Sequence, residues 1–382
     1  MSARVLFHVQ HLLGIGHLRR AALIAAGLEA AGFTVDLVSG GMPVPGLPVR
    51  AIQLPPVQAG PGGFADLRDA AGRPADAAWR ADRGHRLLRL FAVTRPDILL
   101  IEAFPFGRRA FRFELLPLLE AAAARSPRPL VVCSVRDIVQ RRSPDRDAET
   151  RALLDRHFDL VLAHGDPAFA ALSDSFPLAA RIGLRLRHTG IVVDPAACGH
   201  RAAMRAGVLV SAGGGGAGLA LLRTAAAASA LAQGRFGPWR LVCGPNLPES
   251  DRAAVAALAA DDADVDRVRT DMPALLAEAS VVVGQAGYNS VAELLATRTP
   301  AVLVPYARDG ETEQAERAAA MAARGLAVVL PEPDLSAPAL LNAIGQAVAL
   351  RPGHAFDLDG AATTALVLAA AIGLDGRDPQ GL

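Results

Sequence analysis

Short apolar runs alternate with longer stretches of helical period along most of the chain. The runs are rich in Val, Leu and Ile, and the stretches between them are rich in Ala, Leu and Arg. This alternation is typical of a parallel β-sheet with helices on both faces. A first series of strands is expected at residues 4–10, 34–39, 49–54, 97–103, 129–135 and 160–165, with a weaker one at 188–193. A second series is expected at 207–213, 239–244, 265–269, 280–287, 300–305 and 326–330.

The first strand of each series runs into a glycine turn, at 14–16 and at 213–218. The chain has 382 residues, which suffices for two α/β cores. We therefore expect an α/β fold of two Rossmann-like, doubly wound domains. Their expected bounds are 1–193 and 194–360, with a helix and tail at 361–382. Ligands of such sheets bind at the carboxyl ends of the strands, so we expect a cleft between the domains.

Two segments allow more than one interpretation. Residues 58–84 are rich in Gly, Pro and mixed charge, which predicts a long mobile loop leading into a helix. That loop either shapes an acceptor pocket or is a plain surface excursion. The helix expected at 361–373 either caps the second domain or crosses back to the first.

Composition excludes several kinds of chemistry. The formal net charge is +1, and all 39 basic residues are Arg. Without Lys, the chain has no Schiff-base residue, no pyridoxal-phosphate lysine and no P-loop lysine. The Arg residues are scattered, so we expect no nucleic-acid partner.

Cysteine use and hydropathy favour a cytoplasmic location. Cys133, Cys198 and Cys243 are far apart and form no C-x-x-C pair, which fits a reducing compartment and argues against a zinc site. We identify no signal peptide. The longest apolar runs fall short of the roughly 20 residues that a membrane span needs, so we expect no transmembrane helix.

The segment "GIGHLRR" at 14–20 joins the first strand to the first helix. A dinucleotide fingerprint is disfavoured, because Arg19 stands where its third glycine belongs and "VSGG" replaces the acid after strand two. Gly14 and Gly16 let the backbone approach a ligand closely. His17 lies at a helix N-terminus, which lowers an imidazole pKa and suits a general base. The alternative is a histidine that only bonds a backbone group.

Two further glycine turns precede helices. The run of four glycines, Gly213 to Gly216, offers bare N–H groups for a pyrophosphate, with a flexible turn as the alternative. Ser290 and Glu293 follow the third turn with the spacing of a helix capping box. Glu293 could equally bind both hydroxyls of a ribose, and spacing alone does not decide between these roles.

Taken together, these segments resemble the MurG-type two-domain nucleotide-sugar glycosyltransferases, which attach N-acetylglucosamine to a lipid-linked peptidoglycan precursor. The resemblance is strongest from about 268 to 326, where the order and spacing of several motifs agree. The matching positions are Asp271, Met272, Gly287, Ser290, Glu293, Pro305, Glu313 and Gln314.

The resemblance implies a GT-B fold and a set of donor-binding residues. Gly213 to Gly216 would hold the diphosphate, and Glu293 would hold the ribose. Backbone near Arg269 and Thr270 would read the base, and Glu313 with Gln314 would contact hydroxyls of the donor sugar. The full expected donor-binding set is Gly14, Gly16, Gly213, Gly214, Gly215, Gly216, Arg269, Thr270, Met272, Gly287, Ser290, Glu293, Glu313 and Gln314.

The first-domain turn is also similar to the G-x-G-H-x-x-R loop of the nucleotide-sugar hydrolase of pseudaminic acid synthesis, in which the His is catalytic. Charged residues end two strands of the same domain and are candidates for the acceptor side. They are Glu102, Arg108, Arg136 and Asp137, and each is otherwise a solvated loop charge.

These observations predict an inverting glycosyltransferase that moves a hexosyl or N-acetylhexosaminyl group from a nucleotide diphosphate sugar, with UDP as the expected nucleotide. His17 would be the catalytic base, and the acceptor would be a hydroxyl of a small molecule or a lipid-linked one. We expect no cofactor and no metal, since glycine loops and Arg side chains would stabilise the departing diphosphate. The alternatives are a nucleotide-sugar hydrolase, a UDP-N-acetylglucosamine 2-epimerase of the same fold, and a non-catalytic nucleotide-sugar sensor.

Overall fold

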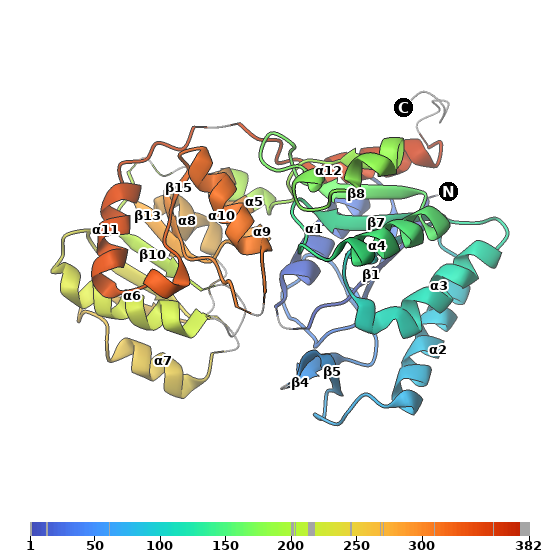
Figure 1. The fold of residues 1–382 in the computed structure, drawn as a ribbon, viewed down its shortest axis with the longest axis horizontal. Coiled ribbons are helices and arrows are strands. Elements are labelled where there is room, and N and C mark those ends of the chain that lie inside the picture. Colours follow the sequence, from blue (N-terminus) through green and yellow to red (C-terminus); the bar gives the residue numbers. More distant parts are fainter. Residues whose placement is uncertain are drawn as a thin grey trace. The chain divides into compact units, whose positions relative to one another are not determined.

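The computed structural model describes residues 2–12, 14–60, 62–199, 202, 204–212, 218–244, 247–267, 269, 271–308, 310–353 and 355–374. The chain divides into two compact units. The first comprises Met1–Val192 with Asp357–Leu382, and the second comprises Val193–Phe356. Each unit is built on a parallel sheet with covering helices, which confirms the expected α/β class (Figure 1).

The first unit contains a seven-stranded sheet of order β3-β2-β1-β6-β7-β8-β9, and every neighbouring pair is parallel. Its strands are β1 (Arg4–Val9), β2 (Thr34–Ser39), β3 (Ala51–Gln53), β6 (Ile98–Glu102), β7 (Leu130–Arg136), β8 (Leu160–His164) and β9 (Leu186–His188). Its helices are α1 (Gly16–Ala30), α2 (Ala77–Thr94), α3 (Arg112–Ala124), α4 (Pro144–His157) and α12 (Gly360–Ala371). The strand order reverses between β1 and β6, which is where doubly wound folds bind ligands.

The two faces of this sheet carry separate hydrophobic clusters, because side chains alternate along a strand. One face packs Phe7, Leu100 and Leu162 against α1 and α12. The opposite face packs Leu6, Leu99 and Val161 together with the apolar sides of α2 and α3. Both faces are therefore buried, as expected for a parallel sheet.

Helix α12 packs against α1 in the first unit. Of the two alternatives for the last helix, the structure therefore shows the one in which it crosses back. The contact is close, since a Cβ added at Gly27 of α1 would lie 3.0 Å from the Ala361 Cβ of α12.

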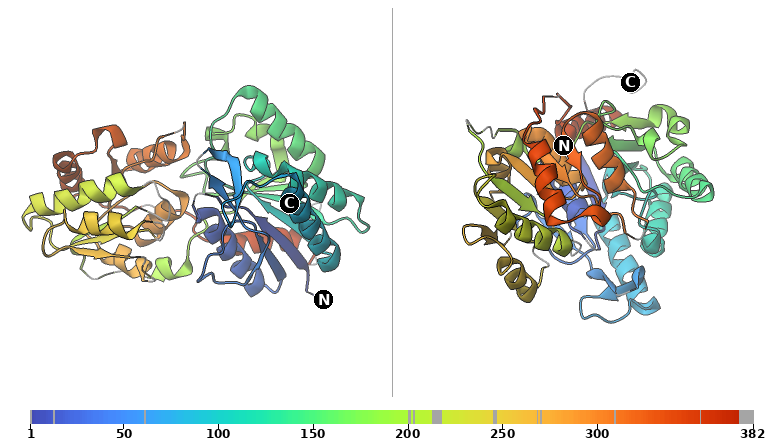
Figure 2. Two further views of the ribbon diagram at one scale, coloured as in Figure 1. Left: turned by 90° about the horizontal axis from the view of Figure 1, so that it is seen from below. Right: turned by 60° about the vertical axis from the view of Figure 1, so that its left-hand side comes forward.

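The prediction of a long loop at 58–84 is wrong over much of that segment. Residues Val57–Gly60 (β4) and Gly63–Asp69 (β5) form an antiparallel hairpin outside the main sheet (Figure 2). Asp69 accepts hydrogen bonds from the Ala71 and Arg73 N–H groups, both at 2.9 Å, and so closes the following turn. Asp76 then caps α2 by accepting from the Trp79 N–H at 2.8 Å. The glycines that suggest a loop instead shape the hairpin turn.

The second unit contains a six-stranded parallel sheet of order β12-β11-β10-β13-β14-β15. Its strands are β10 (Val208–Ser211), β11 (Trp239–Val242), β12 (Asp264–Asp266), β13 (Val281–Gly284), β14 (Ala301–Leu303) and β15 (Ala327–Val329). Its helices are α5 (Pro195–Gly199), α6 (Leu219–Ala232), α7 (Glu249–Ala256), α8 (Met272–Glu278), α9 (Tyr288–Thr297), α10 (Glu313–Ala323) and α11 (Ala337–Ala347). Among the described helices, none is both long and apolar enough to cross a membrane.

Candidate functional site

One face of the first sheet changes from apolar to polar at the carboxyl ends of three adjacent strands. On β6, Leu100 is followed two residues later by Glu102, and on β8, Leu162 is followed by His164. Strand β7 places Ser134 opposite Glu102 and Arg136 opposite His164 in the strand register. Because paired residues share a face, these four side chains lie on the side that α1 covers.

His17, the second residue of α1, reaches this polar edge. Its Nδ1 lies 2.9 Å from Glu102 Oε1, and its Nε2 lies 3.3 Å from Arg136 Nη2. Arg20, one turn along α1, donates to the same oxygen of Glu102. The structure therefore brings together one predicted catalytic residue and two of the predicted acceptor-side residues.

The charges around His17 and Glu102 determine their protonation. Burial of Glu102 by itself raises the pKa of its carboxyl, but Arg20, His17 and Ser134 more than compensate and hold that pKa well below its usual value. Glu102 is therefore a carboxylate, which can only accept, so Nδ1 of His17 must carry the proton in this hydrogen bond. Burial lowers the pKa of His17 well below 6.5, and Arg108 and Arg136 lower it further. The ring is neutral, with its lone pair on Nε2.

The other acceptor-side candidates lie in loops that follow β6 and β7. Arg108 has a left-handed backbone (φ 63°), and its Nε donates to the Gln10 carbonyl at 2.6 Å. Asp137 is buried, and its Oδ1 accepts from the Ile138 N–H at 2.7 Å. Its Cβ occupies space beside Gly165, where an added Cβ would lie 2.6 Å away.

Sequence reasoning missed a second buried polar cluster, on the opposite face of the sheet. Arg83 of α2 is fully buried and pairs with both carboxylate oxygens of Glu114 on α3, at 2.6 and 3.0 Å. It also donates to Gln10 Oε1 at 2.6 Å and to the Gly40 carbonyl at 2.8 Å. A Cβ at Gly40 would lie 2.1 Å from Gln10 Oε1. The glycine at position 40 in the "VSGG" turn was therefore a sequence signal for this cluster, because only glycine lets the backbone approach the Gln10 side chain so closely.

In the second unit, Gly287 is the N-cap of α9 and Ser290 lies inside the helix. The capping-box interpretation of Ser290 and Glu293 is therefore wrong, since the helix begins two residues before Ser290. Glu293 is partly exposed, in the second turn of α9. The turn itself is tightly packed at one end, because a Cβ at Gly284 would lie 2.9 Å from the Ser211 carbonyl oxygen.

Helix α10 is tied to the neighbouring turns by side chains. Gln314 Oε1 accepts from the Tyr306 N–H at 3.1 Å, and buried Glu313 is the first residue of the helix. Buried Arg317 was missed by sequence reasoning. It donates to the Ala286 carbonyl at 3.2 Å, and its guanidinium lies 5.8 Å from the centre of the Tyr288 ring.

Arg269 pairs with Asp271 through two hydrogen bonds, of 2.8 and 2.6 Å, and with Asp266 at 3.2 Å. Arg269 lowers the pKa of the Asp271 carboxyl to about 2. Asp271 is the N-cap residue of α8, and Met272 is the first residue of that helix. Of the other predicted donor-binding positions, Gly16 is the first residue of α1 and Gly14 lies just before its N-cap residue. Gly213 to Gly216 and Thr270 lie outside the described residues.

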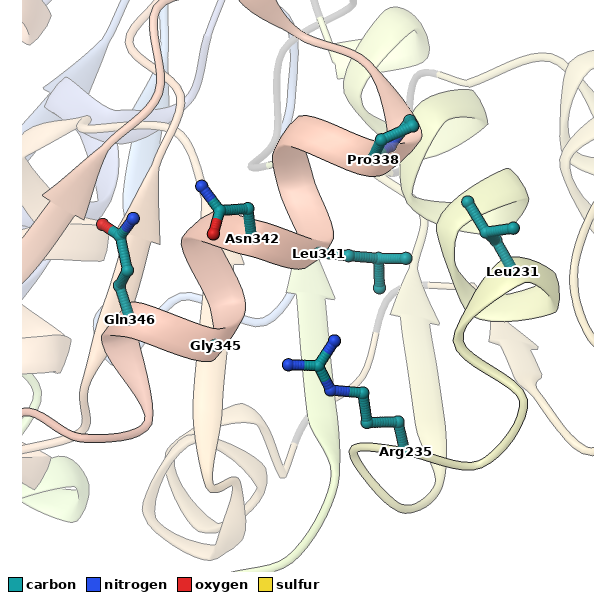
Figure 3. Close-up of a pocket in the computed structure, with 7 residues that line it drawn as sticks. All are labelled: Leu231, Arg235, Pro338, Leu341, Asn342, Gly345 and Gln346. Atoms are coloured by element: carbon teal, nitrogen blue, oxygen red, sulfur yellow. The ribbon is translucent and has the colours of Figure 1, made fainter.

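A surface pocket of the second unit lies between the end of α6 and α11 (Figure 3). Leu231, Arg235, Leu341 and Gln346 help to line it, and it contains none of the predicted donor-binding residues. The described part of the chain contains no group of three or more His, Cys, Asp or Glu side chains placed to hold a metal ion.

Comparisons with known proteins bear on the second unit most directly. Residues 208–353 match the model of the glycosyltransferase family 28 C-terminal domain. Two relatives are named UDP-N-acetylglucosamine–N-acetylmuramyl-(pentapeptide) pyrophosphoryl-undecaprenol N-acetylglucosamine transferase. The one from Rhodospirillum centenum is 40% identical over 70 residues, which is 18% of each chain. The one from Sinorhizobium medicae is 36% identical over 103 residues, 26% of this chain and 28% of the relative. Both alignments thus span less than a third of the relative's length.

Solved structures match over nearly the whole chain at low identity. MurG from Acinetobacter baumannii superposes with a TM-score of 0.55 and 17% identity, covering 95% of each chain. A putative UDP-N-acetylglucosamine 2-epimerase from Listeria monocytogenes gives 0.58 and 13%, covering 99% of this chain and 98% of that one. At such identities the likeness establishes the fold. The chain therefore has the GT-B fold of these proteins, and residues 208–353 of its second unit are similar to the glycosyltransferase family 28 C-terminal domain.

Proposed function

We propose that the protein is an inverting, metal-independent glycosyltransferase. It would move a hexosyl or N-acetylhexosaminyl group from a nucleotide diphosphate sugar, with UDP as the nucleotide, to an acceptor hydroxyl in the cytoplasm. The acceptor would be a small molecule or a lipid-linked one. The observation that carries this proposal is the hydrogen bond between His17 Nδ1 and Glu102 Oε1 at the carboxyl edge of the first sheet. The family 28 domain supports a nucleotide-sugar donor.

His17 would act as the general base. Its Nδ1–H is held by Glu102, so Nε2 is free of a proton of its own and can take one from the acceptor hydroxyl. The lowered pKa keeps the ring neutral at neutral pH. Arg136 donates to Nε2 in this structure, so an acceptor hydroxyl must replace that contact. Such a base contributes about 10²–10⁴-fold to a rate.

The reaction would be a single displacement. The acceptor oxygen attacks the anomeric carbon, the bond from that carbon to the diphosphate oxygen breaks, and the acceptor proton moves to Nε2 of His17. One displacement inverts the anomeric configuration and needs no nucleophilic residue. Arg20, Arg108 and Arg136 gather positive charge around His17, and we propose that such charge stabilises the departing diphosphate.

We propose that the second unit binds the donor. Glu293 would accept hydrogen bonds from the ribose hydroxyls, and Glu313 with Gln314 would contact the sugar. The glycine run at 213–216 would cradle the diphosphate. Gly14, Gly16, Arg269, Thr270, Met272, Gly287 and Ser290 complete the proposed donor-binding set.

Metal independence requires a direct test, because carboxylates are the usual ligands of Mg²⁺ and Mn²⁺. The chain contains Asp-x-Asp triplets, among them Asp145–Asp147 and Asp264–Asp266. We expect full activity after dialysis against EDTA. Loss of activity that returns when Mg²⁺ or Mn²⁺ is added would contradict this part of the proposal.

The decisive experiment measures UDP release from UDP-sugars, with and without a panel of hydroxyl acceptors. His17→Ala should lose about 10²–10⁴-fold in kcat, whereas His85→Ala, at an exposed position of α2, should match the parent. Acceptor-dependent UDP release supports transfer. Release without an acceptor supports the second candidate, a hydrolase, which the same dyad could serve by activating water. Altered sugar without UDP release would indicate the 2-epimerase, and tight binding without turnover would indicate a sensor.

A further inference from the structure

Behind Glu102, a row of buried polar side chains continues away from His17. Ser134, His164 and Thr189 are all fully buried. Ser134 Oγ donates to Glu102 Oε2 and lies 2.9 Å from His164 Nε2. His164 Nδ1 in turn lies 2.8 Å from Thr189 Oγ1. The row links the ends of β6, β7 and β8 with the residue after β9.

The chemistry of these groups allows one consistent direction of hydrogen bonding. The single hydroxyl proton of Ser134 goes to the Glu102 carboxylate, so Ser134 Oγ must accept from Nε2–H of His164. Burial, with a further contribution from Arg20, lowers the pKa of His164 to about 3, so the ring is neutral. Its Nδ1 is therefore a lone pair, which accepts from the Thr189 hydroxyl at 2.8 Å. That hydroxyl also lies 3.3 Å from the Gly190 carbonyl, a longer contact, so its single proton goes to His164 Nδ1. Every donor in the row is thus oriented toward Glu102.

We propose that Ser134, His164 and Thr189 are positioning residues, which hold the Glu102 carboxylate so that His17 keeps its proton on Nδ1 and presents Nε2 to the acceptor. The catalytic meaning of this inference rests on the proposed function. Ser134 binds Oε2 of Glu102, while His17 and Arg20 bind Oε1. Without Ser134, the buried Oε2 would lack this donor, and the carboxylate could turn away from His17.

A purely structural role would not need these residue types. Further back on the same sheet face, the equivalent positions are apolar, at Leu100, Val132 and Leu162. On β6, β7 and β8, polar side chains replace these apolar ones within the last three residues of each strand, next to His17. Buried polar side chains add little net stability over apolar ones, so their concentration at this edge favours a role in the site.

Two matched pairs of variants test the proposal by activity. Ser134→Ala should lower kcat about 10- to 100-fold, the range for a hydrogen bond to a charged group. Ser175→Ala should leave kcat within about twofold, although Ser175 is also buried in this unit and bonds the Val139 N–H at 2.9 Å. Thr189→Val keeps the shape and loses the hydroxyl, and should cost about 2- to 10-fold. Thr189→Ser keeps the hydroxyl and should retain activity. In each case KM should stay within about twofold.

Histidine tautomers give a readout that does not depend on activity. In ¹⁵N-histidine-labelled protein, we expect Nδ1–H for His17 and Nε2–H for His164 by NMR, with assignment from His17→Ala and His164→Gln. In Ser134→Ala, both preferences should weaken, and the pH profile of kcat should change with them. The groups that set the charge of His17 are Arg20, Arg108, Arg136 and Glu102. Cys133, whose pKa burial and Glu102 raise, stays neutral.

The outcomes separate this proposal from the proposed function. If no UDP-sugar is turned over, the proposed function fails, but the tautomers can still be measured. If Ser134→Ala and Thr189→Val match Ser175→Ala and Thr189→Ser in kcat, pH profile and the tautomer of His17, the positioning role is overturned. Opposite tautomers in the parent protein would also overturn it.

Discussion

The protonation of His17 depends on its burial, on the neighbouring arginines and on the Glu102 carboxylate. Burial favours the neutral ring, and Arg108 and Arg136 add to this effect, whereas the hydrogen bond to Glu102 opposes it. The net result is a pKa well below 6.5. A base of this kind is active as soon as the pH exceeds its lowered pKa, so the proposed transferase should work in the neutral range without needing alkaline conditions.

This environment predicts the acidic limb of the pH profile. The limb of kcat/KM should lie below pH 6.5, with activity lost as pH falls and His17 takes up a proton. In Arg136→Gln, one positive neighbour is removed, so the pKa of His17 should rise and the limb should move up toward 6.5. Arg89→Gln, at an exposed position of α2, should leave the limb in place. Movement of the limb to lower pH in Arg136→Gln would contradict this electrostatic account.

Sequence reasoning found part of this arrangement for a physical reason. Glu102 and Arg136 were identifiable because charges directly after apolar strands are conspicuous. Ser134 and His164 were not singled out, although both occupy the same alternating face as Glu102. Their partners depend on which strands are neighbours and on the strand register, and an apolar pattern specifies neither.

The strands were predictable because a doubly buried parallel strand leaves a continuous apolar run. The hairpin of β4 and β5 was missed, since it has only two strands and its alternation is broken by glycines. The start of α9 was also misplaced. A Ser-x-x-Glu spacing predicts a cap only if no earlier residue takes helical geometry, and here the helix begins at Tyr288.

The buried pair of Arg83 and Glu114 joins α2 to α3, and it should dominate the stability of that contact. Burial would raise the pKa of Glu114, but Arg83 and His8 outweigh it and lower that pKa to about 2. Arg83→Met leaves a buried carboxylate without its main partner and should cost about 3–5 kcal/mol of unfolding free energy. Arg86→Met breaks the exposed pair with Asp82 on the same helix and should cost no more than about 0.5 kcal/mol. Urea unfolding measures both, and equal losses would refute the difference in burial as the cause.

Two glycines of one turn should separate folding from donor binding. Gly284→Ala forces a Cβ to within 2.9 Å of a backbone oxygen, and should destabilise the second unit by about 1–3 kcal/mol. Gly287→Ala meets no atom within 4 Å and keeps an allowed φ of −65°, so the unit should fold almost as the parent does. If the turn faces the donor, Gly287→Ala should still weaken UDP binding in calorimetry. Unchanged affinity would remove Gly287 from the donor site.

The first unit is made of two segments that are far apart in the sequence, because the second unit is inserted between them. The chain leaves the first unit after Val192 and re-enters it at Asp357, where Asp357 accepts from the Ile191 N–H at 2.8 Å. The sequence pattern places the start of the last segment at 361, because the residues just before it have no helical period. The residue at which the chain re-enters the first unit is determined by hydrogen bonds between backbone segments that are distant in sequence. Such pairing cannot be predicted from hydrophobic periodicity.

Because α12 completes the face that carries α1, its buried residues should stabilise the first unit selectively. Leu368 is fully buried, whereas Leu366 is 65% exposed on the same helix. Leu368→Ala should cost about 2–5 kcal/mol, and Leu366→Ala should stay within about 0.5 kcal/mol. In scanning calorimetry, Leu368→Ala should lower the transition of the first unit by roughly 5–15 °C and leave that of the second unit unchanged. A fall of both transitions together would instead mean that the units unfold as one. Since α1 carries His17, the proposed turnover should be lost at the temperature where the first unit melts, while the proposed UDP binding by the second unit should persist.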